Sequence, residues 1–291
     1  MRKIDIIMPV YNEPVEIVSQ TISRLLKLQN GNIDINIIVV DDGSNPPLEQ
    51  DSLKKIADIN IIKHEENRGY GSALKTGIKS SDAPWIGIID ADGTYPVEDF
   101  NSMFNYLDNA DMIVGVRTGD INEIPALRRV PKAFLNNFAS YLANARIVDL
   151  NSGMRIFRRS LANYLWELFP TGFSFTSTIT MGAILGNYVV VNHQINYYKR
   201  EGKSSIHPIK DTLRFFRLIL RLGLLFSPAK IFAPVAGVLF FAGICKGFFR
   251  DYLLLGYIGN LAVILMLGSV QIVMMGFIAE LIVHSRKLSN K

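Results

Sequence analysis

Short apolar runs alternate with amphipathic segments through residues 1–200. Buried strands are predicted by the apolar runs at residues 4–8, 35–40, 59–63, 85–89, 112–116 and 154–158. Helices are predicted by apolar residues at helical spacing in residues 14–27, 50–57, 70–80, 97–107 and 133–145. Strands that alternate with helices in this way form a mostly parallel sheet covered on both faces. The pattern therefore predicts an α/β domain, which we end at residue 205.

The pattern changes after this domain. In residues 206–226, apolar side chains recur at helical spacing, and a second face carries the basic residues Lys210, Arg214, Arg217 and Arg221. Such a helix is typical of a segment that lies in a membrane interface, although a soluble amphipathic helix shows a similar pattern. We interpret residues 206–230 as an amphipathic juxtamembrane segment because a long apolar stretch follows directly.

Two long apolar stretches, residues 231–249 and 257–283, lie in the last part of the chain. At about 1.5 Å per helical residue, each is long enough to cross a hydrocarbon core of about 30 Å. Their short connection predicts a hairpin of two transmembrane helices, so we assign residues 231–291 to a membrane hairpin and a basic tail. The alternative is a buried hairpin in the core of a soluble protein.

The distribution of charge favours the membrane. A net charge of +5 fits either nucleic acid or an anionic lipid surface. Eight Lys or Arg residues stand against two acids in residues 199–230, and three more basic residues follow the second apolar stretch. Because basic residues mark cytoplasmic loops, we expect the α/β domain and both termini in the cytoplasm. We expect a bacterial or archaeal plasma membrane rather than the endoplasmic reticulum, and no nucleic acid.

Acidic residues follow two of the predicted strands. Asp41 and Asp42 come directly after the strand at 35–40, and Asp90 and Asp92 come after the strand at 85–89. The carboxyl ends of strands form the edge at which an α/β sheet binds ligands. Two carboxylates this close in sequence can converge on a divalent cation that neutralises a diphosphate. The clusters predict a metal-assisted nucleotide site, although Asp42 alone would also suit a helix cap or a turn.

Other familiar sites are excluded. The single cysteine, Cys245, lies within an apolar stretch, and the four histidines are scattered, so no zinc site of Cys or His is expected. Gly69 and Gly71 begin like a dinucleotide fingerprint, but Leu74 stands where its third glycine belongs. We interpret the two glycines as positions of close backbone packing near the nucleotide.

Six motifs occur in a characteristic order: PVYNE (9–13), VVDDGS (39–44), NRGYGSALKTG (67–77), DADGTYP (90–96), DLNSGMR (149–155) and YKREGKSS (198–205). The first four resemble the family 2 glycosyltransferases, which have a GT-A fold. Together with the last two motifs and the terminal apolar stretches, they resemble the polyprenyl-phosphate glycosyltransferases, a group that includes dolichyl-phosphate mannose synthases. This resemblance covers essentially the whole chain.

The resemblance implies roles on the donor side. The residues implied to bind the donor nucleotide are Pro9, Tyr11, Glu13, Asp42 and Asp90. Asp90 and Asp92 are implied to hold Mg²⁺ or Mn²⁺, and Asp92 is also implied to be catalytic. In many mannose synthases of this group, a metal-binding Gln stands where this chain has Thr94, so the third ligand is left open.

On the acceptor side, a polyprenyl phosphate needs cations beside it. The available arginines are Arg117, Arg128, Arg129, Arg155 and Arg200. From these, the resemblance favours Arg117 and Arg200 as catalytic residues that also bind the acceptor phosphate, with Arg129 and Ser204 as further phosphate contacts. We expect Ser152 and Gly153 to shape the acceptor side and Asp149 to orient a neighbouring group, with a plain turn as the alternative.

The predicted function is that of a membrane-bound inverting glycosyltransferase. It would move a hexose from a nucleotide sugar, GDP-mannose or a UDP-hexose, to undecaprenyl or dolichyl phosphate on the cytosolic face. Two alternatives are a non-catalytic membrane module that binds a nucleotide sugar, and a transferase with a different acceptor. Glycines in the apolar stretches would also permit close packing between subunits of a homo-oligomer.

Overall fold

The computed structural model describes residues 1–28, 32–49, 51, 53, 56–57, 59–118, 137–172, 174–198 and 208–289. The chain forms two compact units. The first contains residues 1–136 and 145–212, and the second contains residues 137–144 and 213–291. The predicted helix at 50–57 and the first part of that at 133–145 fall largely outside the described residues, whereas residues 137–143 are helical.

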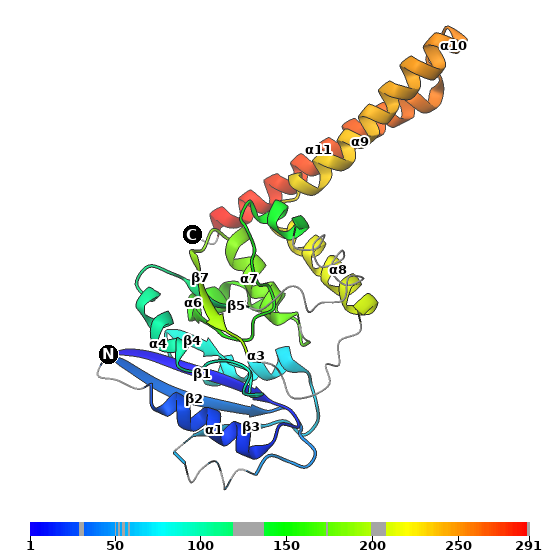
Figure 1. Cartoon of the computed structure of the whole chain (residues 1–291). Helices are drawn as coiled ribbons and strands as arrows, with labels where there is room; N and C mark the ends of the chain where they lie inside the picture. Colours follow the sequence, from blue (N-terminus) through cyan, green and yellow to red (C-terminus); the bar gives the residue numbers. More distant parts are fainter. Residues whose placement is uncertain are drawn as a thin grey trace. The chain divides into compact units, whose positions relative to one another are not determined.

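The first unit is built on a sheet with strand order β3-β2-β1-β4-β6-β5-β7 (Figure 1). All neighbouring strands are parallel except β6, which runs antiparallel to β4 and β5. The strands are β1 (Arg2–Val10), β2 (Ile33–Asp41), β3 (Asn60–Lys63), β4 (Trp85–Ile88), β5 (Met112–Thr118), β6 (Arg155–Arg158) and β7 (Val190–Asn196). The mostly parallel α/β sheet is thus confirmed. Strand β7 was not predicted, although three valines precede its polar half.

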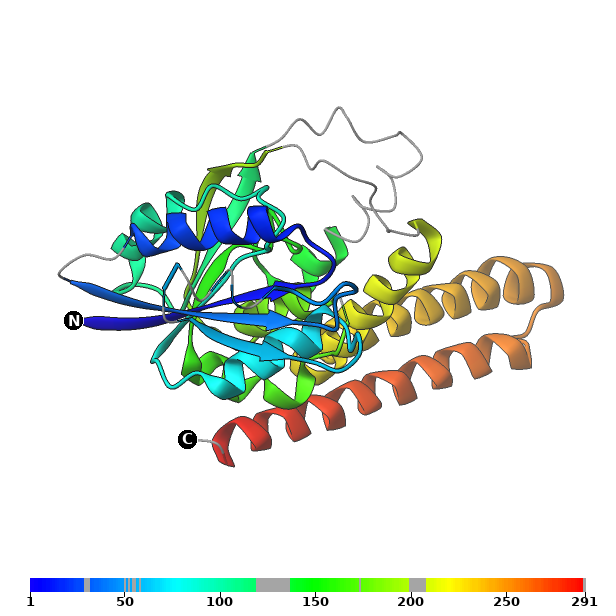
Figure 2. The same ribbon diagram turned by 90° about the horizontal axis from the view of Figure 1, so that it is seen from below.

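Helices cover both faces of this sheet. On one face, alternate β1 side chains share a core with α1 (Val15–Leu26), α4 (Asp99–Met103) and η1 (Phe104–Tyr106). On the other face lies α3 (Tyr70–Ser80), and a Cβ added at Gly77 would stand only 2.4 Å from Ile7 of β1. Figure 2 shows α1 and α3 on opposite sides of the strands. The remaining helices of this unit are α6 (Arg159–Tyr164), η3 (Trp166–Leu168) and α7 (Phe175–Leu185).

The second unit is helical. After α8 (Pro208–Phe226), which belongs to this unit from residue 213 onward, its elements are α9 (Ala229–Cys245), the π-helical turn η4 (Lys246–Tyr252), α10 (Leu253–Leu255) and α11 (Asn260–Ser289). Helices α9 and α11 pack closely, since a Cβ at Gly243 would lie 2.9 Å from Met266 and one at Gly276 would lie 3.0 Å from Phe232. This confirms the predicted helical hairpin.

The hairpin contains two helices, Ala229–Tyr252 and Asn260–Ser285, that are long and apolar enough to cross a membrane. Only 17% of the most apolar window of each is buried. Large apolar side chains such as Phe241 and Leu281 are more than two-thirds exposed. The helices of a soluble core would bury these side chains, so the exposed apolar surface favours membrane association.

Charged side chains make polar contacts at both ends of the hairpin. Near its turn, Lys246 Nζ lies 2.8 and 2.9 Å from the carboxylate oxygens of Asp251, which also accepts a hydrogen bond from the Gly259 amide. At the other end, the Glu280 carboxylate accepts a hydrogen bond from the Ala229 amide at the start of α9. Lys246, Asp251 and Glu280 thus each have a polar partner, as a low-dielectric environment requires.

Candidate functional site

The predicted nucleotide-binding residues begin at the carboxyl end of β1. Pro9 is the next-to-last residue of that strand, and Tyr11, which follows the strand, is 48% exposed. Between them and Glu13, Asn12 adopts a left-handed φ of 54° and exchanges hydrogen bonds with the loop after β2: its amide donates to Ser44 Oγ, and its Oδ1 accepts from the Asn45 amide. The loops after β1 and β2 thus form one structure at this edge, with an exposed aromatic ring available to a base.

Two aspartates at the end of β2 organise these loops. Asp41 is fully buried and accepts hydrogen bonds from the amides of Ser44 and Leu48, which closes the loop after β2. Asp42 accepts hydrogen bonds from the amides of Arg68 (3.0 Å) and Gly69 (2.8 Å). The direct contact of Asp42 with a nucleotide stays a prediction, because its observed partners belong to the protein.

His64 is the third partner of Asp42. Its Nδ1 lies 2.6 Å from Asp42 Oδ1, and its Nε2 lies 2.9 Å from the Thr76 hydroxyl. A ring protonated on Nδ1 donates to the carboxylate and accepts from Thr76. Both the His64 and the Asp42 side chains are 4% exposed. The buried pair therefore connects the end of β2 with α3 through Thr76.

Glycines permit the close approach of these segments. A Cβ at Gly43, whose φ is +72°, would stand 2.5 Å from the Glu66 carbonyl carbon. A Cβ at Gly71 would stand 2.3 Å from the Pro170 carbonyl oxygen. The prediction of close backbone packing at Gly69 and Gly71 is confirmed, with residues 170–172 as the opposing backbone.

The acid pair lies at the carboxyl end of β4. Asp90 accepts a hydrogen bond of 2.8 Å from the Tyr70 hydroxyl, and Asp92 Oδ1 accepts one of 2.6 Å from the Thr94 hydroxyl. Burial, and then repulsion by Asp92, raises the pKa of Asp90 to about 6. Thr94 is buried, and its hydroxyl is used in the hydrogen bond to Asp92.

This arrangement fits a divalent cation. Desolvated carboxylates that repel each other are stabilised by a cation between them, and carboxylate oxygens are the ligands that Mg²⁺ and Mn²⁺ accept. Among the described residues, no group of three or more His, Cys, Asp or Glu side chains is placed to hold a metal ion. Asp90 and Asp92 would therefore hold the ion, and substrate phosphates would complete its coordination, as is usual for Mg²⁺.

Gly153 limits the position of Asp90. A Cβ at Gly153 would lie 2.0 Å from Asp90 Oδ2. The Gly153 amide donates a hydrogen bond of 2.7 Å to the Tyr95 hydroxyl. The carboxylate thus fits between Tyr70 and a backbone segment that has no side chain at this point.

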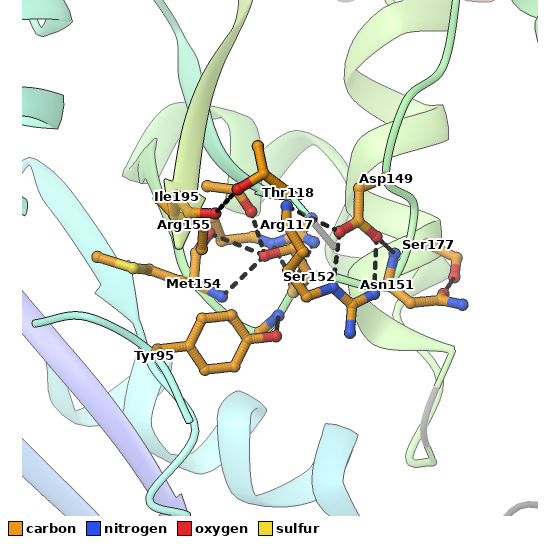
Figure 3. Close-up of polar contacts among 12 residues, drawn as sticks. Tyr95, Arg117, Thr118, Asp149, Asn151, Ser152, Met154, Arg155, Ser177 and Ile195 are labelled. Atoms are coloured by element: carbon orange, nitrogen blue, oxygen red, sulfur yellow. Dashed lines mark hydrogen bonds and ion pairs between the residues drawn. The ribbon is translucent and has the colours of Figure 1, made fainter. Parts of the chain in front are cut away.

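Arg117, in β5, is the predicted acceptor cation within the described residues. Its Nε and Nη2 donate to the two oxygens of Asp149, at 2.7 and 2.8 Å (Figure 3). Its guanidinium also lies 5.3 Å from the centre of the Tyr197 ring. Burial alone would lower the pKa of Arg117, but the hydrogen bonds and charge of Asp149 raise it. Within the described part of the chain, Nη1 has no hydrogen-bond acceptor, so it is available to an anion.

The prediction that Arg155 is available to a phosphate is wrong. Its side chain is fully buried. Its donors are directed to the carbonyl oxygens of Ser152 and Thr176 and to the Thr180 hydroxyl. A side chain with no exposed surface cannot contact a lipid phosphate. Arg128, Arg129, Arg200 and Ser204 lie outside the described residues.

Sequence reasoning missed the residues that support the predicted ones. Tyr70 and His64 lie near the NRGYGSALKTG motif, but their partners Asp90 and Asp42 are 20 and 22 residues away. Tyr95 was read only as part of DADGTYP, although its hydroxyl binds the Gly153 amide 58 residues later. Polar residues inside a motif were the available signal, but their pairing depends on the fold.

Two family models match the chain. Glycosyl transferase family 2 matches residues 5–166, and the GtrB C-terminal hairpin matches residues 227–284. The low-salt glycan biosynthesis hexosyltransferase Agl6 of Haloferax volcanii is 28% identical over 81% of this chain, which spans 58% of that protein. The dolichyl-phosphate hexose transferase of the same organism is 23% identical, with 70% of this chain and 86% of that protein covered.

A solved structure resembles this chain in fold. It is the glucosyl-3-phosphoglycerate synthase of Mycobacterium tuberculosis in complex with Mn²⁺, uridine-diphosphate-glucose and phosphoglyceric acid. The TM-score is 0.59 at 16% identity, with 76% of this chain and 80% of that chain covered. The predicted GT-A fold is confirmed, with a helical hairpin after it.

Proposed function

The chain belongs to glycosyl transferase family 2, and we propose that it transfers a hexose from a nucleotide sugar to a polyprenyl phosphate at a membrane surface. The family assignment makes it a glycosyltransferase, and the hairpin model matched at residues 227–284 supports a membrane-bound form. The proposed donor is GDP-mannose or a UDP-hexose. The proposed acceptor is undecaprenyl or dolichyl phosphate.

One observation carries this proposal. Asp90 and Arg117 contact the two ends of one short segment, residues 149–153. A Cβ at Gly153 would lie 2.0 Å from Asp90 Oδ2, and the Asp149 carboxylate binds the Arg117 guanidinium, so the acid pair and this cation lie near each other at one edge of the sheet. A donor diphosphate and an acceptor phosphate are both anions, so their reaction requires positive charge on each side. A metal held by the acid pair and the guanidinium of Arg117 would supply these charges.

In the proposed reaction, an oxygen of the acceptor phosphate attacks the anomeric carbon of the hexose. The bond from that carbon to the diphosphate breaks on the opposite side, which inverts the configuration. A phosphate oxygen is already largely ionised near neutral pH because its second pKa is about 6, so the chain needs no general base. A divalent cation at Asp90 and Asp92 would neutralise the leaving diphosphate. Arg117, oriented by Asp149, would hold the attacking phosphate in line.

The other binding roles are proposals of the same kind. We assign the donor base and ribose to Pro9, Tyr11, Glu13 and Asp42. In this proposal Arg129, Arg200 and Ser204 also bind the acceptor phosphate, and Arg200, like Arg117, is a catalytic cation. The support for these roles is the motif order in the sequence, except for Arg129, which lies outside the six motifs in a basic connection between predicted elements.

The charges around the hairpin support a proposed membrane arrangement. With eleven basic residues at its outer ends and two at its turn, the excess of positive charge favours both ends in the cytoplasm. The proposed reaction would then occur on the cytosolic face. Cysteine labelling from outside sealed cells tests this: a cysteine placed at Tyr257, near the turn, should react, and one placed at Tyr106 in the α/β domain should not.

The decisive experiment uses the full chain in detergent. With undecaprenyl or dolichyl phosphate, Mg²⁺ or Mn²⁺ and a panel of nucleotide sugars, we expect a glycosyl phospholipid and an equimolar nucleoside diphosphate with at least one donor. Asp92→Asn should lose this activity, whereas Asp108→Asn, which changes an exposed acid paired with Arg2, should keep it.

The alternatives give different results. Donor binding without turnover on any polyprenyl phosphate or on water-soluble phosphate acceptors would favour a binding module. Turnover that occurs with a soluble acceptor but not with the lipid would favour a different transferase. Either result would refute the proposed acceptor.

A further inference from the structure

A short loop connects the two sides of the proposed site. At one end of the segment 149–153, the Asp149 carboxylate binds the Arg117 guanidinium through two hydrogen bonds. At the other end, Gly153 packs against the Asp90 carboxylate so closely that a Cβ would lie 2.0 Å from it. The segment therefore contacts the proposed acceptor cation and the proposed metal ligand at once. Its conformation fixes the spacing between them.

Arg155 forms hydrogen bonds with this loop and with α7. Its Nε and Nη2 both donate to the Ser152 carbonyl, and its Nη1 donates to the Thr176 carbonyl (2.9 Å) and the Thr180 hydroxyl (2.8 Å). The forked guanidinium thus joins the loop to α7. Figure 3 shows Arg155 beside Ser152, on the opposite side of the loop from the Tyr95 ring.

Two further contacts leave the loop little freedom. The Ser152 hydroxyl donates a hydrogen bond of 2.5 Å to the Gly115 carbonyl of β5. The Gly153 amide donates to Tyr95. The loop is therefore attached to β5, to α7 and to the segment after the acid pair. Arg155 donates two of these bonds, both to the Ser152 carbonyl, and the Ser177 hydroxyl of α7 donates one to Asn151 Oδ1.

A buried arginine has a large desolvation penalty, which is unusual for a purely structural contact. Among the described residues Arg155 has no salt-bridge partner, and burial lowers its pKa, while the charges of Asp149 and Asp90 act in the opposite direction. Burying a charge without a contacting counter-ion is unfavourable because the charge loses its hydration. The Arg155 charge interacts with both Asp149, which is in the loop, and Asp90, which packs against it. This favours a role in the site rather than in stability alone.

We propose that Arg155 is a positioning residue for the transfer reaction: by fixing the 149–153 loop, it sets Arg117 relative to Asp90. This inference rests on the proposed function. In-line displacement requires the two phosphates to be held at a defined separation, and a misplacement of about 1 Å can cost about 100-fold in rate. Arg155 would act on both sides of the reaction without touching either substrate.

The test compares Arg155→Lys with Arg159→Lys in the full-length protein. Arg159 is a matched control because it also donates to carbonyl oxygens and a hydroxyl, at Ala83, Ile78 and Ser81, away from the acid pair. Lysine keeps the charge but loses the fork that binds several acceptors. For Arg155→Lys we expect kcat to fall about 10- to 100-fold, as for other supporting contacts, and hydrolysis of the donor to increase relative to transfer. For Arg159→Lys we expect kcat within about twofold of the wild type.

A second readout does not depend on turnover. Titration of Mn²⁺ in the presence of a nucleoside diphosphate, followed by electron paramagnetic resonance, should show binding weakened about fivefold or more in Arg155→Lys. It should be unchanged in Arg159→Lys. If the wild type transfers no sugar to any polyprenyl phosphate, the proposed function fails, while this titration still decides the role of Arg155.

Equal Mn²⁺ affinities and equal rates in the two variants would overturn the inference. If Arg155→Lys does not fold, Thr180→Val replaces it, because this change removes one acceptor of Arg155 and leaves the Thr176 carbonyl in place. We then expect a smaller fall in kcat, about threefold to tenfold, with weaker Mn²⁺ binding. Wild-type values for both quantities in a folded Thr180→Val protein would also refute the role of Arg155.

Discussion

Asp42 and Asp90 stand at the ends of strands β2 and β4, which flank β1, yet their surroundings differ. The Asp42 carboxylate is surrounded by donors: the His64 ring and two backbone amides. Among the described residues, the Asp90 carboxylate accepts one hydrogen bond, from Tyr70, and it faces the negative charge of Asp92. One carboxylate is satisfied by the protein, and the other is not.

This difference separates two kinds of acidic residue in one site. A carboxylate that accepts several hydrogen bonds is stable as it stands, so it fixes the loops around it. A desolvated carboxylate beside another acid lacks this stabilisation and is completed by a cation. Asp42 should therefore control the shape of the nucleotide site, and Asp90 should control the chemistry.

The largest effect should come from Asp90→Asn. The amide keeps the size of the side chain but weakens the proposed metal site, so we expect kcat/KM to fall by about 10³-fold or more, which is about 4 kcal/mol of transition-state stabilisation. The thermal unfolding temperature of the metal-free protein should not fall, because a repulsive charge is removed. Steady-state transfer assays and calorimetry measure the two quantities.

Asp42→Asn is the matched comparison. Its amide group would face the backbone donors of residues 68 and 69, so we expect a lower unfolding temperature and weaker donor binding. Its effect on kcat should be at least tenfold smaller than that of Asp90→Asn. Equal losses of kcat in the two variants would contradict the division of roles.

The next effect tests the space around Asp90. In Gly153→Ala the new methyl group would overlap Asp90 Oδ2, so the carboxylate has to move away from its place beside Tyr70. A displacement of about 1 Å at a reacting centre costs about 100-fold in rate, and we expect a loss of this size together with a higher Mn²⁺ requirement. Gly172→Ala is the control, because a Cβ there meets nothing within 4 Å. Normal kinetics in Gly153→Ala would show that Asp90 is not held in this place.

The sequence predicted the elements that depend on local patterns. Most strands and helices of the α/β sheet follow from apolar runs and helical spacing, and the acids at 42, 90 and 92 fall at strand ends because a strand stops where its apolar run stops. The hairpin follows from the length of two apolar stretches.

What the sequence could not predict depends on contacts between distant segments. Strand β7 begins with valines but continues with Asn192, His193 and Gln194, because it lies at the edge of the sheet and pairs only with β5. Arg155 has the right chemistry for a phosphate, yet β6 turns it toward α7, where it is fully buried. The positions of these residues follow from the packing of strands, which no short motif records.

The smallest effect should come from His64, which belongs to the satisfied side of the comparison. His64→Ala removes a donor to Asp42 and a partner of Thr76, at a cost of about 1–3 kcal/mol in unfolding free energy. Because the loop from 64 to 69 shapes the proposed donor site without touching the reacting atoms, we expect the donor KM to rise about tenfold with kcat changed less than about threefold. His64→Asn can still place a hydrogen-bond donor near Asp42 and should recover most of the affinity for the nucleotide sugar. His193→Ala, at a histidine that packs on Tyr106, should change neither kcat nor the donor KM. A fall in kcat with an unchanged KM would place Asp42 and His64 in the chemistry and would remove the distinction between the two carboxylates.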